Sequence, residues 1–256
     1  MPGRTIERLL GATQGHLARA RRALEHVRWR ELALRRERCA ACGLPLLIKL
    51  ENSEMGVRCP RCGASAVALS LAEVVFERLG LGHATRAWEM SADGPLVRAM
   101  RKRFAQLATS EFFAGVASGT VVDGVRCENV EAPSWPDRAF DLVTSTEDFE
   151  HVADDARGFA QVRRVLAPGG WFAFTVPLSG RHQTVERTML RAGERVPLLA
   201  PTYHSDRRQG RQIFVYRDYG FDIVESLAAA GFAEVELRPP TAKLFGHGRA
   251  VIVARK

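Results

Sequence analysis

The chain has 256 residues, 46% of them hydrophobic and 26% charged, a composition that supports a folded core and argues against intrinsic disorder. No apolar run approaches the ~20 residues that a membrane-spanning helix needs. The N-terminus also lacks the apolar stretch and small-residue cleavage site of a secretory signal. The sequence therefore predicts a cytoplasmic protein without membrane insertion, built from one medium domain and a small appendage.

The net charge of +8 is concentrated at the start of the chain. Residues 1–38 contain ten Arg against four Glu, a net of +6. Apolar residues recur there at three- and four-residue steps, which predicts a basic amphipathic helix over residues 1–36. Its Arg-rich face is either a solvated surface or a footprint for nucleic acid. Its apolar stripe packs on the rest of the chain or on a second copy, which leaves a homodimer open.

Four cysteines mark residues 37–68 as a separate module. The pattern is CAACG and then CPRCG, with sixteen residues between Cys42 and Cys59. Each CxxC turn aims two thiolates at one point, and two such turns make the closed tetrahedral site of structural zinc. The predicted zinc ligands are Cys39, Cys42, Cys59 and Cys62. An iron–sulfur centre and disulfides are the alternatives. The zinc-ribbon-like module either only stabilises the fold or also recognises RNA or protein.

From residue 69 onward, helical and strand-like segments alternate, which predicts an α/β layer fold. Helices are expected at residues 69–80, 93–104 and 221–232, and within 158–178 before a Pro-Gly-Gly turn. Strands are expected at residues 86–91, 104–111, 124–127, 139–146, 171–178, 233–240 and 249–256. Cys127 stands alone in one of these strands and is interpreted as a small buried hydrophobic residue.

Residues 140–177, FDLVTSTEDFEHVADDARGFAQVRRVLAPGGWFAFTVP, carry a specific resemblance. FDLV, EHV and RVLAPGG at this spacing resemble the fourth-to-fifth-strand region of class I S-adenosylmethionine-dependent methyltransferases of the type 11 kind. The resemblance covers residues 86–256. It implies a doubly wound, mostly parallel, seven-stranded Rossmann-like sheet for a domain at residues 69–256, whose last strand is inserted antiparallel beside the sixth.

The resemblance also implies a cofactor pocket beyond the carboxyl ends of the strands. The family's first motif is acid-x-Gly-x-Gly-x-Gly, and here it begins at Glu89. Ser91, Asp93 and Pro95 replace the three glycines, so Gly94 is expected to supply the turn from a shifted register. Asp93 is expected to cap the helix or to meet the ammonium group of the cofactor.

Further cofactor contacts follow from the same resemblance. Glu111, at the end of the second strand, would accept hydrogen bonds from both ribose hydroxyls. Asn129 and Val130 would hold the adenine, with Asn129 in place of the more usual Asp. Thr146, after the fourth strand, would border the transferable methyl group.

Candidate catalytic residues are His151, in EHV, and His204, in a long polar insertion between the fifth strand and the last helix. His151 is otherwise interpreted as a helix-capping histidine. Insertions of this length often form substrate lids, so Tyr203, His204 and Asp206 are predicted to contact substrate. The alternative is a loop that is ordered by its own hydrogen bonds.

The sequence thus predicts an S-adenosylmethionine-dependent methyltransferase with an unidentified acceptor. A small molecule is the first interpretation of the acceptor, and RNA or a protein is the second. The alternative is a catalytically inactive, methyltransferase-like zinc-ribbon scaffold or adaptor that binds RNA or protein. A dinucleotide oxidoreductase would need GxGxxG after the first strand, and the sequence lacks it there.

Overall fold

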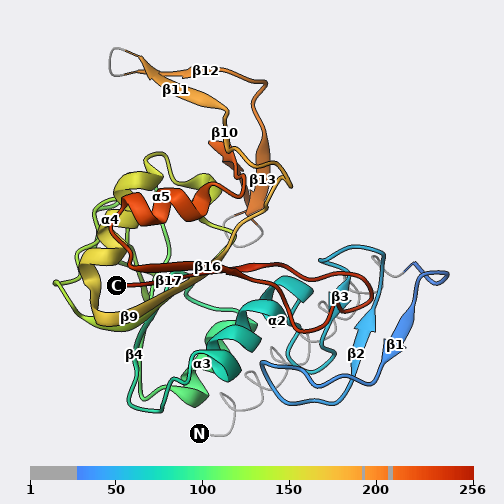
Figure 1. Cartoon of the computed structure of the whole chain (residues 1–256). Helices are drawn as coiled ribbons and strands as arrows, with labels where there is room; N and C mark the ends of the chain where they lie inside the picture. The colour runs from blue at the N-terminus through green and yellow to red at the C-terminus, as the bar shows by residue number, and fades with distance from the viewer. Residues whose placement is uncertain (1–27, 192–193, 207–209) are drawn as a thin grey trace, which may run out of the picture.

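The structure, a computed structural model, describes residues 28–191, 194–206 and 210–256 (Figure 1). Most of the predicted N-terminal helix, and with it the question of a homodimer, lies outside these residues. The prediction was wrong for its last part, because residues 28–36 contain a turn and strand β1 (Ala33–Arg35). β1 pairs antiparallel with β2 (Leu47–Lys49), and this pairing overrides the local helical spacing.

A six-stranded sheet forms the centre of the molecule, in the order β16-β17-β9-β8-β4-β5. Its strands are β4 (Arg86–Glu89), β5 (Gln106–Thr109), β8 (Phe140–Thr146), β9 (Leu166–Thr175), β16 (Glu234–Arg238) and β17 (Val251–Arg255). β5, β4, β8 and β9 are parallel, whereas β17 lies antiparallel to both β9 and β16. The doubly wound α/β fold and the inserted antiparallel last strand are confirmed.

Of the seven expected strands, the third one, at residues 124–127, contributes only one bridge to the sheet in the described part of the chain. Glu111 and Cys127 form an isolated parallel bridge beside β5. The neighbouring residues instead fold into a short hairpin of β6 (Val121–Val122) and β7 (Val125–Arg126). This local hairpin takes up the backbone hydrogen bonds that a longer third parallel strand would have used.

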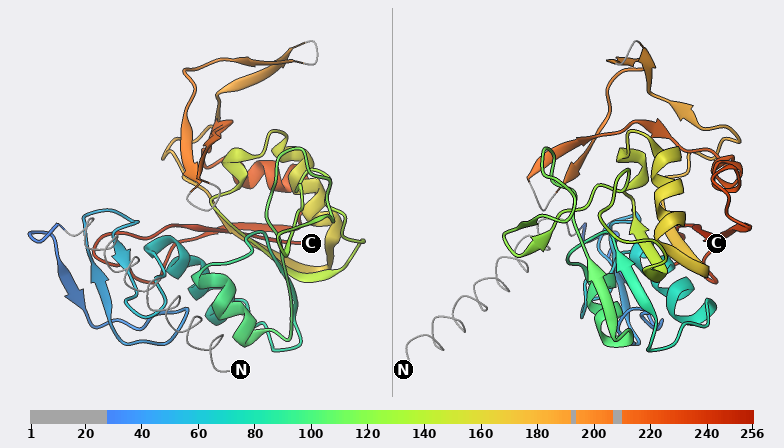
Figure 2. Two further views of the ribbon diagram at one scale, coloured as in Figure 1. Left: turned by 180° about the vertical axis from the view of Figure 1, so that it is seen from behind. Right: turned by 90° about the vertical axis from the view of Figure 1, so that its left-hand side faces the viewer.

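Helices cover both faces of the sheet (Figures 1 and 2). They are α2 (Ala66–Glu73), which continues into the π-helix η1 (Val74–Arg78), α3 (Pro95–Arg103), α4 (Asp155–Val165) and α5 (Ile223–Ala229). Adjacent residues of each strand enter different cores: Ala87 packs with α2 and α3, while Trp88 packs with α4 and α5. This alternation follows from the two-residue period of a strand.

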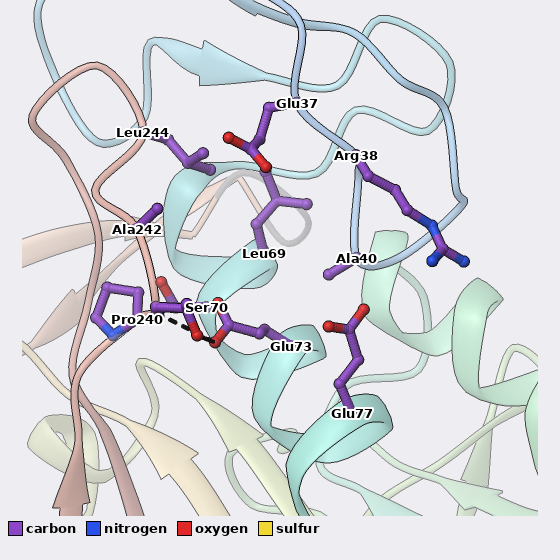
Figure 3. A pocket seen from close by; sticks show the side chains of 11 residues that line it. Glu37, Arg38, Ala40, Leu69, Ser70, Glu73, Glu77, Pro240, Ala242 and Leu244 are labelled. Carbon is purple, nitrogen blue, oxygen red and sulfur yellow. Dashed lines mark hydrogen bonds between the residues drawn. The ribbon is translucent and has the colours of Figure 1, made fainter.

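The cysteine-rich module packs directly against the domain. Its three strands, β1, β2 and β3 (Val57–Arg58), lie beside α2 and the loop between β16 and β17 (Figure 1). A small cavity of about 240 Å³ marks this contact, and beside it Glu73 accepts a hydrogen bond from the Thr241 amide at 3.1 Å (Figure 3). Arg249 pairs with Glu54 at 2.7 Å and with Glu147 at 3.1 Å. These contacts fix the module to the loop that follows β8.

The insertion between β9 and α5 forms paired strands that rise away from the sheet (Figures 1 and 2). The pairs are β10 (Val185–Glu186) with β15 (Arg217–Asp218), β11 (Thr188–Arg191) with β12 (Glu194–Pro197), and β13 (Tyr203–Asp206) with β14 (Arg211–Phe214). Across the described residues, no helix has the length and apolarity to cross a membrane.

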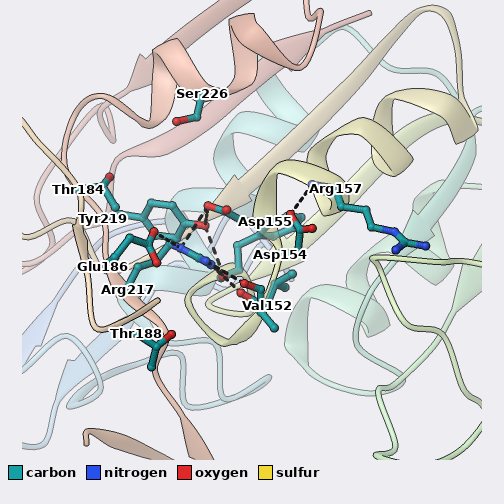
Figure 4. A network of polar contacts seen from close by, with 12 residues as sticks. Val152, Asp154, Asp155, Arg157, Thr184, Glu186, Thr188, Arg217, Tyr219 and Ser226 are labelled. Carbon is teal, nitrogen blue, oxygen red and sulfur yellow. Dashed lines mark hydrogen bonds and ion pairs between the residues drawn. The ribbon is translucent and has the colours of Figure 1, made fainter. Parts of the chain in front are cut away.

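Arg217 anchors this insertion to the domain (Figure 4). Its guanidinium is buried and pairs with Glu186 at 2.8 Å and with Asp155 at 3.4 Å. It also donates to the backbone carbonyl of Val152 at 2.6 Å, and the nearby Tyr219 hydroxyl donates to Asp155 at 2.8 Å. Because charges and donors are satisfied together, the network holds the base of the insertion against the start of α4.

We expect Arg217→Ala to lower the free energy of unfolding by about 3 kcal/mol, since removal of one member of a buried ion pair leaves the others unpaired. Urea unfolding followed by circular dichroism measures this change. Limited proteolysis should show faster cleavage within residues 176–222. Arg181→Ala, an exposed arginine of the same insertion, is the matched control. Equal unfolding midpoints for the two variants would contradict the anchoring role.

Candidate functional site

A cavity of about 980 Å³ lies beyond the carboxyl ends of β4, β5 and β8. This is the edge at which ligands bind in open α/β sheets. Six residues predicted to contact the cofactor line it: Ser91, Asp93, Glu111, Asn129, Val130 and Thr146. The other two, Glu89 and Gly94, are not lining residues but lie next to Met90 and Asp93, which are. The parallel pairing of the three strands therefore brings together residues from four separate segments.

Glu89 ends β4 and is almost fully buried. Its carboxyl group accepts a hydrogen bond from the Thr144 hydroxyl of the adjacent β8. Burial raises the pKa of Glu89 to about 8, against which hydrogen bonds from Thr144 and Ser91 act only partly. Glu89 is therefore mostly protonated at neutral pH and joins the strand end to the turn that follows it.

The turn after β4 takes an unusual course. Gly94 has φ 147°, a backbone conformation that side chains disfavour, and Pro95 then begins α3. Asp93 pairs with Arg98 at 2.9 Å, and the Ala92 amide donates to Glu111 Oε1 at 3.0 Å. The turn thus keeps one glycine where the conformation demands it, and Glu111 holds its backbone.

Asp148 is a further acidic residue in the cavity lining. Its carboxylate accepts hydrogen bonds from Ser145 Oγ at 2.7 Å and from the Thr146 amide at 3.2 Å. Burial, together with the negative charges of Glu150 and Glu111, raises its pKa to about 7. The sequence analysis missed Asp148, although it directly follows the recognised FDLVTSTE stretch. This side of the cavity is consequently electronegative and favours cationic ligands.

The opposite side of the cavity is formed by the segment after the Glu111–Cys127 bridge. Asn129 Oδ1 accepts a hydrogen bond from the Glu131 amide at 2.9 Å, and the Asn129 amide donates to Ser118 Oγ at 3.0 Å. These bonds fix a tight turn that presents Val130 to the cavity. A flat apolar ring with a polar edge would find an apolar contact and a polar neighbour here.

The two predicted catalytic histidines lie in contact. His204 Nδ1 is 3.2 Å from His151 Nε2, and the rings meet edge to face. Glu150 lies beside both: its Oε1 is 3.6 Å from His204 Nδ1 and 3.8 Å from His151 Nε2. The carboxylate of Glu150 raises the pKa of His204. The sequence named the two histidines but gave no sign of their contact, nor of the role of Glu150.

The β13–β14 hairpin forms one wall of the cavity, as the lid hypothesis requires. The residues that line the wall are Ser205, Gln212, Ile213, Phe214 and Tyr216. Tyr203 is exposed and its ring packs against Phe214 with 5.5 Å between centroids, so it lies beside the lining rather than in it. The side chain of Asp206 lies outside the described residues.

Met55, from the cysteine-rich module, also lines the cavity. The sequence pattern did not predict that Met55 lines the cavity, because this position depends on how the module packs against the methyltransferase-like domain. The module therefore borders the ligand site as well as the sheet.

The four cysteines converge at a separate point. Their sulfur atoms all lie within 4.8 Å of one another, with Cys39–Cys62 at 3.6 Å and Cys42–Cys59 at 3.5 Å. These spacings are too long for a disulfide, whereas four ligands at 2.3 Å from a tetrahedral zinc ion stand about 3.8 Å apart. The donor set and spacing therefore fit a four-sulfur metal site.

The two halves of this cluster repeat one backbone motif. In each half, the glycine after the second cysteine has φ 77° and donates its amide to the carbonyl of the first cysteine at 2.8 Å. The first cysteines, Cys39 and Cys59, are buried. Such paired turns orient both thiols of a CxxC toward one point.

Comparison with known proteins gives matches to the same part of the chain. Residues 80–174 match the family model for a methyltransferase domain. A malonyl-[acyl-carrier protein] O-methyltransferase from Geobacter sulfurreducens is 38% identical over 104 residues, which are 40% of this chain and 34% of that protein. The chain thus matches about a third of the length of this curated relative.

Solved structures are similar at lower sequence identity. An S-adenosylmethionine-dependent methyltransferase from Mesorhizobium loti has 20% identity and a TM-score of 0.48, over 75% of this chain and 99% of that chain. The 1,6-didemethyltoxoflavin-N1-methyltransferase of Burkholderia thailandensis has 17% identity and a TM-score of 0.46, over 75% of this chain and 78% of that chain.

Glu89 makes stability depend on pH. Its pKa rises from 4.5 to about 8 on folding, so the folded state holds this proton more tightly than the unfolded state. The associated stability is full below pH 4.5 and is lost as the pH rises to about 8. We expect Glu89→Gln, which keeps the neutral shape, to lose less stability than the wild type across this window.

Urea unfolding at a series of pH values tests this expectation. Glu225→Gln, on the exposed face of α5, should keep the wild-type slope. A Glu89→Gln protein with the same pH dependence as the wild type would show that Glu89 titrates normally.

Proposed function

We propose that this protein transfers the methyl group of S-adenosylmethionine to an acceptor bound in the 980 Å³ cavity, because residues 80–174 match the family model for a methyltransferase domain. The observation that carries the proposal is the presence of Glu111 and Asp148 in the lining of this cavity, beyond the carboxyl ends of β5 and β8. S-adenosylmethionine has a sulfonium and an ammonium group, both of which an electronegative wall favours. The anionic pyrophosphate of a dinucleotide would be repelled by the same wall.

Different residues of the cavity bind different parts of the cofactor. Glu111 accepts hydrogen bonds from the ribose hydroxyls while its other contact, the Ala92 amide, keeps the turn after β4 in place. Asn129 and Val130 hold the adenine. Ser91, Asp93 and Gly94 surround the amino-acid end, where the start of α3 supplies backbone amides and the positive end of a helix dipole.

The cofactor supplies an activated methyl group on sulfur, which is displaced in line by the acceptor. The protein positions the acceptor and excludes water from the cavity. Thr146 and His151 line the end of the cavity nearest the insertion, and the β13–β14 hairpin covers that end. An acceptor held there at about 3–3.5 Å from the methyl carbon would react with little loss of orientational freedom.

The acceptor is a small molecule under this proposal. The wall formed by Gln212, Ile213 and Phe214 combines one amide with two apolar side chains, which suits an acceptor with both polar and apolar parts. The Geobacter relative is named for methyl transfer to oxygen on a malonyl group carried by a protein, which is consistent with an oxygen acceptor. An RNA or protein acceptor would instead be expected to use the cysteine-rich module, which borders the cavity at Met55.

The four-cysteine cluster holds a structural zinc ion under the same proposal. A four-sulfur site leaves no open position, so the ion stabilises the module and takes no part in catalysis. The described cysteines are all free of disulfides, as zinc binding in a reducing cytoplasm requires.

We expect Glu111→Ala to weaken S-adenosylmethionine binding by about 10–100-fold, because it removes charge-assisted hydrogen bonds of about 1.5–3 kcal/mol. Isothermal titration calorimetry of the purified protein measures this. Glu225→Ala, an exposed acid on α5, should bind as the wild type does. If the folded wild-type protein does not bind S-adenosylmethionine at millimolar concentration, the proposal is wrong. The inactive scaffold that binds RNA or protein is then favoured.

We expect Cys59→Ser to release the zinc ion and to expose the module to protease, while Cys127→Ala keeps the ion. Cys127 is the matched control because it is buried but distant from the cluster. Metal content is measured by inductively coupled plasma mass spectrometry. Equal zinc content in the two variants would show that the cluster does not hold the ion.

A further inference from the structure

A second group of metal-ligating side chains lies at the lid end of the cavity. It consists of Glu150 and His151, from the 3-10 helix η2 (Phe149–His151), and His204, from β13. One ligand atom from each of the three residues lies within 4.8 Å of the other two. Two imidazole nitrogens and one carboxylate oxygen form a donor set used by catalytic zinc and by non-haem iron.

The hydrogen bonding of His151 prepares one nitrogen for a ligand. His151 Nδ1 donates its proton to the Phe214 carbonyl at 2.7 Å. This bond fixes the tautomer of the neutral ring, so Nε2 carries a lone pair and points toward Glu150 and His204. A backbone acceptor on the far nitrogen is the usual support of a metal-bound histidine.

The buried carboxylate of Glu150 gives independent support for a bound cation. Its side chain is about 1% exposed, and neither carboxylate oxygen has a hydrogen-bond partner among the described residues. A buried carboxylate without hydrogen bonds is costly unless a positive charge compensates it. The only groups that approach its Oε1 among the described ion pairs are His151 and His204, at 3.8 and 3.6 Å.

The cluster is open on the cavity side, unlike the four-cysteine site. His151 lines the cavity, and the His204 side chain is about 45% exposed. An ion held by three protein ligands keeps further coordination positions for water or substrate. The lid hairpin supplies one of the three ligands, so ion binding would also hold β13 against η2.

We propose that Glu150, His151 and His204 bind a divalent first-row transition-metal ion, which holds a hydroxyl oxygen of the methyl acceptor. This inference rests on the proposed methyl transfer for its role, although the ion site itself stands on the three side chains alone. It narrows the acceptor to a molecule with an acidic or metal-binding hydroxyl, because the ion lowers the pKa of an oxygen that it contacts.

The transfer step balances with no further reagent. The acceptor hydroxyl gives its proton to solvent, and an oxygen lone pair forms the new bond to the methyl carbon. The carbon–sulfur bond breaks as this bond forms, and its electron pair goes to sulfur. The sulfonium becomes the neutral thioether of S-adenosylhomocysteine.

Cobalt(II) titration of the zinc-loaded full-length protein tests the site. Prior loading with one molar equivalent of zinc fills the four-thiolate cluster, the tighter zinc site, and leaves the second site open to cobalt. Nitrogen and oxygen ligands give cobalt visible bands without the intense sulfur-to-metal charge transfer of a thiolate site. We expect one saturable set of such bands, with His204→Ala and Glu150→Gln weakening cobalt binding at least tenfold. His182→Ala, an exposed histidine of the same insertion, should leave it unchanged.

The same variants are titrated with S-adenosylmethionine to separate the two proposals. Cobalt binding that depends on His204 and Glu150 supports the ion site, whether or not the cofactor binds. A wild-type protein that binds the cofactor but shows no cobalt bands, or bands equal in all variants, overturns the ion site and leaves methyl transfer standing.

Discussion

The arrangement of this protein depends on the parallel pairing of β4 with β5 on one side and β8 on the other. Parallel strands end at a common edge, so the polar residues that follow them meet there whatever their distance in the sequence. The pairing places Glu89 against Thr144 and brings Glu111 and Asp148 to one cavity. Burial raises the pKa of Glu89 and Asp148, so their charged forms are disfavoured at this edge. A cationic ligand would relieve them.

Two appendages complete the cavity from outside the sheet. The Arg217 network fixes the base of the insertion (Figure 4). The β13–β14 hairpin contacts η2 through His204 and the Phe214 carbonyl, which both lie against His151. Arg249 connects the cysteine-rich module to Glu147, in the loop after β8. Both attachments use arginines with several simultaneous partners, a geometry to which the planar guanidinium is suited. The ligand cavity is therefore shaped by three parts of the chain whose positions are coupled.

The turn after β4 keeps its shape although three glycines of the first motif are replaced. Gly94 takes the one conformation in this turn that requires glycine, and the Ala92 amide is held by Glu111. The same carboxylate is proposed to bind the ribose, so turn shape and cofactor affinity are linked through one residue. Loss of Glu111 would consequently disturb the amino-acid end of the pocket as well as the ribose end.

The sequence by itself determined the α/β class and the four-cysteine cluster, because these depend on periodicity and on short spacings. The inserted antiparallel last strand followed from the resemblance of residues 86–256 to a known family. The resemblance also pointed to seven of the residues that line the cavity, because they lie at or just after expected strand ends. Only the tertiary structure decided the contact of His204 with His151, the isolation of Glu150 and the contribution of Met55. These depend on how the insertion and the cysteine-rich module dock, which side-chain packing sets and local sequence does not encode. The same reason explains why β1 replaced the end of the expected helix, and why the third expected strand shrank to the Glu111–Cys127 bridge.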